Sequence, residues 1–111
     1  YSQAVKAGNL MFVSGQIPLD PKTGDLVSDS IEEQAKQVLK NVQSICEAAG
    51  YSLDDIVKIS IFLTDLSNFG IVNDVMKEYF SEPYPARATV EVSALPLGVN
   101  VEIEAIVLIN D

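Results

Sequence analysis

Histidine is absent from this 111-residue sequence, and arginine occurs once, at position 87. Without histidine there is no Ser-His-Asp triad, no Cys-His pair and no histidine ligand for a metal. The one cysteine, Cys46, excludes an intramolecular disulfide and fits a reducing compartment, so we expect a cytoplasmic protein. No apolar run approaches the roughly 20 residues that a membrane-spanning helix needs.

Basic residues are also scarce: Lys and Arg total 7 against 16 Asp and Glu, a formal net charge of −9. Nucleic acids and anionic membranes are bound by clustered Lys and Arg, so both are poor partners here. The sequence has no glycine-rich phosphate loop and no metal-ligand spacing, so we expect neither a cofactor nor a metal. A hydrophobic content of 48% predicts one globular domain over residues 1–111. Because the chain starts at Tyr1 rather than at Met, we expect further residues before it.

Hydrophobic periodicity predicts two helices. The first begins after Ser30, where Ser30 and Glu33 form a capping-box pattern, and it ends at Gly50. The second begins within residues 65–67, and the prolines at 83 and 85 end it.

Strands are predicted at residues 10–13, 57–63, 88–92 and 100–109. This order of elements indicates an α+β or α/β fold with two helices on one face of a single sheet. The other face carries several apolar residues that two helices cannot cover, so we expect it to self-associate.

Arg87 is the first candidate for chemistry. It stands at the start of a predicted strand, in Pro85-Ala86-Arg87. A guanidinium group binds a carboxylate through two parallel hydrogen bonds, which predicts an anion site. A surface ion pair is the alternative.

Glu102 and Glu104 interrupt the most apolar strand and, by period two, share the face that points away from the helices. Apolar neighbours raise the pKa of a carboxyl group, which can then act as a general acid or base. An exposed polar sheet face is the alternative. By the same count, Arg87 and Thr89 share one face of the preceding strand.

Ser14 and Gly15 end the first predicted strand, where a glycine allows a ligand to approach the backbone closely. A simple turn is the alternative. Cys46 lies in the apolar stripe of the first helix and is interpreted as packing, whereas Tyr1 and Asn73 have no evident role by themselves.

Together these residues resemble the reactive intermediate deaminase family, also called Rid or YjgF. The resemblance covers the whole chain, and its most specific segments are Pro85-Ala86-Arg87-Ala88-Thr89-Val90-Glu91-Val92, Leu95-Pro96 and Val101-Glu102-Ile103. Ser14-Gly15-Gln16-Ile17-Pro18 and Asn73 also match. The resemblance implies a chorismate mutase-like fold with a mixed sheet, and a homotrimer with a cleft between each pair of subunits. It also implies a short strand before Tyr1.

The implied activity is hydrolysis of enamines and imines, such as 2-aminoacrylate and 2-iminobutanoate, to 2-keto acids and ammonia without a cofactor. By position, Arg87 would hold the substrate carboxylate and Glu102 would activate the attacking water. Ser14, Gly15, Tyr1 and Asn73 would line the cleft. Many members carry Cys where this chain has Thr89, which leaves only the backbone carbonyl of Thr89 to contact the substrate nitrogen.

Two other functions are compatible with parts of this pattern. A sensor that binds small carboxylates or 2-keto acids would need Arg87 but not a water-activating Glu102. RNA cleavage has also been attached to the family, and the net charge of −9 and the absence of histidine argue against it.

Overall fold

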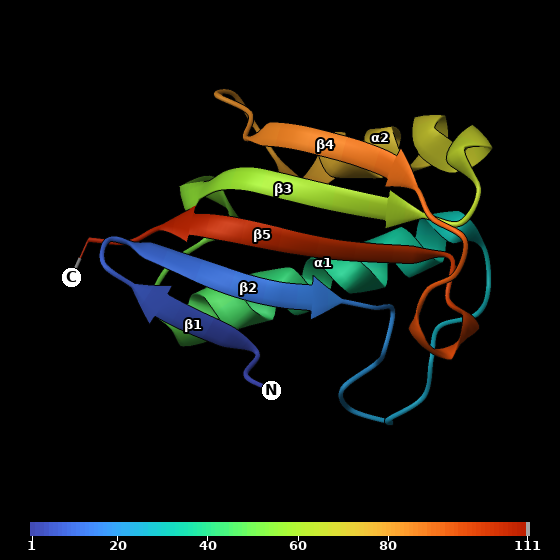
Figure 1. Cartoon of the computed structure of the whole chain (residues 1–111), viewed down its shortest axis with the longest axis horizontal. Coiled ribbons are helices and arrows are strands. Elements are labelled where there is room, and N and C mark those ends of the chain that lie inside the picture. Colours follow the sequence, from blue (N-terminus) through green and yellow to red (C-terminus); the bar gives the residue numbers. More distant parts are fainter. Residues whose placement is uncertain (111) are drawn as a thin grey trace.

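The sheet has five strands in the order β1-β2-β5-β3-β4 in the computed structural model, which describes residues 1–110 (Figure 1). The strands are β1 (Ala4–Ala7), β2 (Leu10–Gln16), β3 (Ile56–Leu63), β4 (Ala86–Glu91) and β5 (Val101–Leu108). β3 and β4 run parallel and the other neighbouring pairs run antiparallel. The prediction of one mixed sheet in an α+β domain is therefore confirmed.

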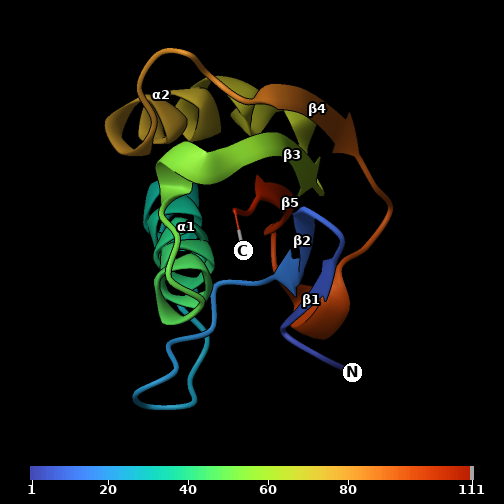
Figure 2. The same ribbon diagram turned by 90° about the vertical axis from the view of Figure 1, so that its left-hand side faces the viewer.

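Two helices, α1 (Ile31–Ala48) and α2 (Phe69–Tyr79), cover one face of this sheet (Figure 2). Short 3-10 turns, η1 (Leu53–Asp55), η2 (Leu66–Asn68) and η3 (Pro96–Gly98), lie between the main elements. α2 connects the parallel strands β3 and β4, as a crossover between parallel strands requires. Neither helix of the described chain is both long and apolar enough to span a bilayer.

The hydrophobic core lies between the helices and the alternate residues of β5. Val101, Ile103, Ala105 and Val107 are buried toward α1, as their period-two spacing predicts. Burying a valine or isoleucine side chain stabilises a fold by roughly 1.5–3 kcal/mol. The intervening residues, including Glu102, therefore point to the opposite face.

The N-cap and the glycine stop predicted for α1 are both present, but among the described residues the Glu33 side chain does not return the second hydrogen bond of the predicted capping box. The hydroxyl of Ser30 accepts a hydrogen bond from the Glu33 amide at 3.2 Å, which satisfies one free donor of the first turn. Gly50 follows the helix with a φ of +90°, a conformation that costs glycine little. Lys36 and Glu32, one turn apart on the exposed side of α1, form an ion pair at 3.1 Å.

Four elements differ most from the sequence prediction, and the other boundaries agree to within one or two residues. β1 was not predicted, because Ala4–Ala7 lacks an apolar alternation, and β4 begins two residues earlier than expected. α2 begins only at Phe69, because Asp65 caps the separate turn η2. β2 does not end at Ser14 but continues to Gln16 through a shift in register.

The face of the sheet away from the helices is uncovered, as predicted. Four of its apolar side chains are 40–53% exposed: Val5, Phe12, Val90 and Leu108. Their positions follow from the register, since Val5 pairs with Phe12 across β1 and β2, and Val90 pairs with Phe62 across β4 and β3. An apolar face of this kind is typical of a protein interface.

Candidate active site

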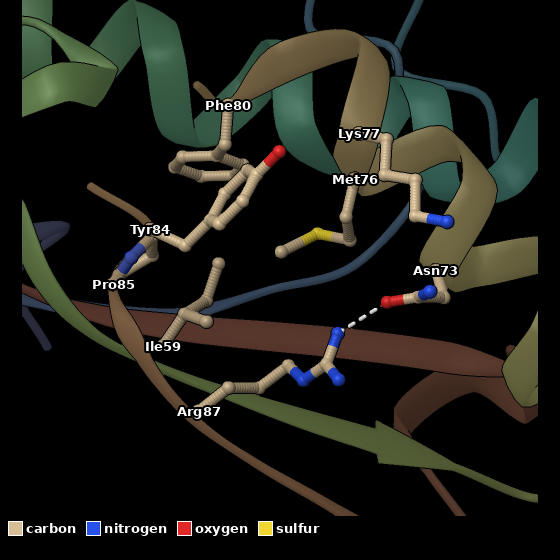
Figure 3. A pocket seen from close by; sticks show the side chains of 8 residues that line it. All are labelled: Ile59, Asn73, Met76, Lys77, Phe80, Tyr84, Pro85 and Arg87. Carbon is tan, nitrogen blue, oxygen red and sulfur yellow. Dashed lines mark hydrogen bonds between the residues drawn. The ribbon is translucent and has the colours of Figure 1, made fainter. Parts of the chain in front are cut away.

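Arg87 lies on β4 with its side chain on the helix-covered side of the sheet. It pairs in register with Ile59 of β3, whose side chain is fully buried in the core. Its Nη1 donates a hydrogen bond to Oδ1 of Asn73 on α2 at 2.5 Å (Figure 3). The guanidinium carbon lies 5.1 Å from the centre of the Phe69 ring. These contacts orient the guanidinium group and leave its charge uncompensated.

No carboxylate within residues 1–110 forms an ion pair with Arg87. This finding does not support the alternative that Arg87 is an ion-paired surface residue. Asn73 and Phe69 are neutral, so the fork retains donors for an external anion.

A pocket of about 350 Å³ opens beside the guanidinium group, between α2 and the start of β4 (Figure 3). Its lining carries two cationic residues, Arg87 and Lys77, and no acidic one. The remaining lining residues are Ile59, Asn73, Met76, Phe80, Tyr84 and Pro85. In a chain with 16 acidic residues, this lining favours an anionic ligand with an apolar part.

Sequence reasoning did not identify Met76, Lys77, Phe80 or Tyr84 as part of a site. The signal was present in α2. Positions 73, 76, 77 and 80 follow the i, i+3, i+4, i+7 spacing that places residues on one helix face. Asn73 is polar, so its place on that helix face indicates that the face does more than pack against the hydrophobic core.

Thr89 lies two residues beyond Arg87 on the same strand face, because it pairs with the buried Ile61. Its hydroxyl oxygen is buried and has no hydrogen-bond partner among the described residues. An unsatisfied buried hydroxyl costs roughly 1–3 kcal/mol, so such groups often serve a ligand.

Glu102 lies on β5, on the opposite side of the sheet from Arg87. It is half-buried and pairs in register with Phe62 of β3. Burial raises the pKa of its carboxyl group, and the nearby charge of Glu104 raises it further. A raised pKa makes this carboxylate a stronger base than a fully solvated one, which suits it to general-base catalysis.

Gly15 is in direct contact with this carboxylate. A Cβ atom at Gly15 would lie 2.6 Å from Oε2 of Glu102. The contact arises at the irregularity in β2, where Val13 pairs with Ala105 but the next paired residue, Gln16, faces Ile103. One extra residue is therefore inserted at Ser14–Gly15, which is a β-bulge.

Ser14 fixes the N-terminal segment beside this bulge. Its hydroxyl donates to the carbonyl oxygen of Ser2 at 2.6 Å, and its amide donates to the carbonyl oxygen of Gln3 at 2.9 Å. The adjoining Tyr1 is fully exposed. Tyr1, Ser14, Gly15 and Glu102 thus belong to one region of the surface.

The predicted site residues therefore form two groups, which lie on opposite sides of the sheet within one chain. Arg87, Asn73 and Thr89 lie at the edge of the sheet on the helix-covered side, and the group around Glu102 lies on the open side. The period-two count gave the partners within each strand correctly. It could not predict whether Arg87 and Glu102, on different strands, point to the same side of the sheet. The pairing of Arg87 with Ile59 and of Glu102 with Phe62 determines this. No cluster of three or more metal-ligating side chains occurs in the described part of the chain.

Comparison with known proteins identifies the family. Residues 1–109 match the family described as Endoribonuclease L-PSP. A RutC family protein of Pyrococcus horikoshii is 56% identical over 106 residues, which cover 96% of this chain and 84% of that protein. A human protein named 2-iminobutanoate/2-iminopropanoate deaminase is 45% identical over 108 residues, which cover 97% of this chain and 79% of that protein.

Solved structures agree with the sequence match. The crystal structure of E. coli TdcF with bound serine superimposes with a TM-score of 0.93 at 44% identity, covering 99% of this chain and 88% of that one. Because both the family match and these relatives extend over nearly the whole chain, the protein belongs to the Endoribonuclease L-PSP family, the family of Rid, YjgF and RutC proteins.

Proposed function

We propose that this protein hydrolyses the imine forms of 2-amino acids to 2-keto acids and ammonia. The observation that carries the proposal is the guanidinium group of Arg87, which is oriented by neutral partners and has no carboxylate partner within residues 1–110. It is ready to bind the carboxylate of a small substrate. The names of relatives at about 45% identity, among them the human and the Dermatophagoides farinae deaminases, support the same activity.

Glu102 performs the proton transfer in this proposal. An enamine such as 2-aminoacrylate first tautomerises to its imine. Glu102 then accepts a proton from water as the water oxygen bonds to the imine carbon, and the imine nitrogen takes a proton from solvent, which gives a carbinolamine. Glu102 returns its proton to the amine nitrogen, the C–N bond breaks, and ammonia leaves as the hydroxyl proton passes to solvent and the carbonyl group of the 2-keto acid forms. A positioned general base contributes typically 10²–10⁴-fold, which suits imines because they already hydrolyse in water.

The two groups act together when two copies of the chain meet. Arg87 of one subunit, with Asn73 and the backbone carbonyl of Thr89, holds the carboxylate and nitrogen of the substrate. Glu102 of its neighbour, with Gly15, supplies the base. The uncovered apolar sheet face supports such association, and a homotrimer with three equal clefts satisfies it with closed symmetry.

Mixing two inactive variants tests the shared cleft. Arg87→Ala and Glu102→Gln each remove one half of the site and leave the other half intact. Random mixed assembly of equal amounts should restore about a quarter of wild-type turnover, because each cleft draws its halves from two subunits. No recovery, although light scattering shows mixed oligomers of three chain masses, would place both residues in one subunit's site or outside the site.

Glu102→Gln also separates the deaminase from a 2-keto acid sensor. Glutamine keeps the size of the side chain but cannot accept a proton. The deaminase should lose two to four powers of ten in turnover and still bind 2-keto acids. Wild-type protein that binds 2-keto acids but releases no ammonia from freshly generated 2-iminobutanoate would favour the sensor. RNA cleavage, which the family's description suggests, receives no support from a net charge of −9 and a single arginine.

A further inference from the structure

The pocket beside Arg87 is larger than the smallest imines need. The proposed reaction requires only that the carboxylate reach the guanidinium group and that the imine carbon face the base. A methyl or ethyl side chain would occupy little of a pocket of about 350 Å³, a volume within the usual range for binding whole small molecules. Most of the pocket would remain empty with such substrates.

The lining indicates what fills it. Ile59, Met76 and Phe80 form an apolar wall at one end, and the Tyr84 ring lies next to Phe80 (Figure 3). Arg87 and Asn73 lie at the other end, and the Lys77 amine points away from Ile59 and Tyr84 (Figure 3). The pocket is thus polar at one end and apolar at the other.

We infer that this pocket binds the side chain of the substrate, and that the preferred imino acids carry a large apolar or aromatic side chain, like those derived from leucine, methionine and phenylalanine. The inference rests on the proposed function and names its substrate class. With the carboxylate on Arg87, the side chain extends along this apolar wall, which is itself almost fully buried, and the apolar surface of the substrate leaves water. Each buried CH₂ group then strengthens binding by about fourfold.

Tyr84 is the residue through which this can be tested. It is 58% exposed, in the connection between α2 and β4, so its ring can be removed without opening the core. Met76 is 6% exposed and faces the same pocket, so Met76→Phe fills the space. Ile71 provides a matched control, because it is an exposed apolar residue of α2 that does not line the pocket.

The experiment compares kcat/KM for imines generated from alanine, leucine and phenylalanine. The wild type should favour the two larger substrates by at least about tenfold, the usual lower value for one extra methylene in an apolar pocket. Tyr84→Ala should lower the ratio of kcat/KM for the phenylalanine imine to that for the alanine imine by roughly tenfold. Met76→Phe should lower the same ratio, with the melting temperature measured as a check on folding, and Ile71→Ala should leave it unchanged.

Competition by keto acids distinguishes failure of this inference from failure of the proposed function. Phenylpyruvate should bind more tightly than pyruvate, and Tyr84→Ala should remove the difference, even if no imine is turned over. Equal kcat/KM values for all three imines, or an equal effect of Tyr84→Ala on each, would overturn the side-chain pocket and leave the deaminase standing. A preference for the aspartate-derived imine that Lys77→Gln abolishes would also overturn it, because the pocket would then bind a second carboxylate.

Discussion

The space between Gly15 and Glu102 is too small for a methyl group. In Gly15→Ala the new Cβ would lie 2.6 Å from Oε2, 2.8 Å from Cδ and 3.2 Å from Cγ of Glu102. Ordinary contacts between such atoms begin at about 3.4 Å, so the carboxylate must move by roughly 0.8 Å. The backbone of Gly15 has no positive φ, so alanine itself fits the chain.

The expected consequence falls on catalysis rather than on folding. A displacement of about 1 Å at a catalytic group can cost roughly 100-fold in rate. We therefore expect Gly15→Ala to lose about two powers of ten in kcat. The KM should change little, because Arg87 holds the substrate carboxylate on the other half of the cleft. Ammonia release from freshly generated 2-iminobutanoate measures both constants.

Gly70→Ala is the matched control. Gly70 lies in α2 with no atom within 4 Å of its added Cβ, so the same chemical change meets open space. This variant should keep wild-type turnover and unfold at a slightly higher temperature, since alanine favours a helix over glycine by up to about 1 kcal/mol. Wild-type turnover in Gly15→Ala would show that the position of the Glu102 carboxylate does not limit the reaction.

Four further perturbations test the charges and the thiol. Arg87→Lys keeps the charge and loses the planar fork, so kcat/KM should fall roughly 10–100-fold with the oligomer unchanged in light scattering; unaltered kinetics would remove Arg87 from the site. Because the base must be ionised and burial raises the pKa of Glu102, activity should fall as the pH is lowered through a midpoint above 4.5. Glu104→Gln should move that midpoint down, since it removes a like charge, and a midpoint that does not move would exclude this coupling. Burial raises the pKa of Cys46 to about 11, so a thiol reagent at pH 8 should label the protein only after unfolding, and rapid labelling of the native protein would contradict this.

The sequence was sufficient to predict the elements with strong periodicity. The cap at Ser30, the glycine stop at position 50 and the alternation along β5 each depend on local chemistry, and each is confirmed. β1 has no such pattern, because its residues are mostly exposed. The two-residue sequence Gly8-Asn9, which joins β1 to β2 with Gly8 at a φ of +63°, is a hairpin signal that could have revealed it.

The candidate site was harder to predict because it depends on how strands are joined. Residue types and the family resemblance indicated Arg87 and Glu102 as site residues. Which side of the sheet each residue faces depends on how β4 and β5 pair with β3, the strand that lies between them. The direct contact between Gly15 and Glu102 depends on the inserted residue in β2. No single-sequence pattern distinguishes that insertion from a strand that ends.

Because of the bulge in β2, a related protein can keep this fold and still lose the arrangement of its catalytic residues. With one residue fewer at positions 14–15, Gln16 would stay opposite Ile103, and the single residue left before it would pair with Glu104 in a regular ladder. Loss of one codon at positions 14–15 would restore the regular ladder while Met11 and Val13, which precede it, kept their places in the core. Descendants of such a gene could fold normally without the bulge that now lies against the Glu102 carboxylate. The length of this strand, more than the similarity of its core, is therefore the feature to inspect when activity is assigned to a related sequence.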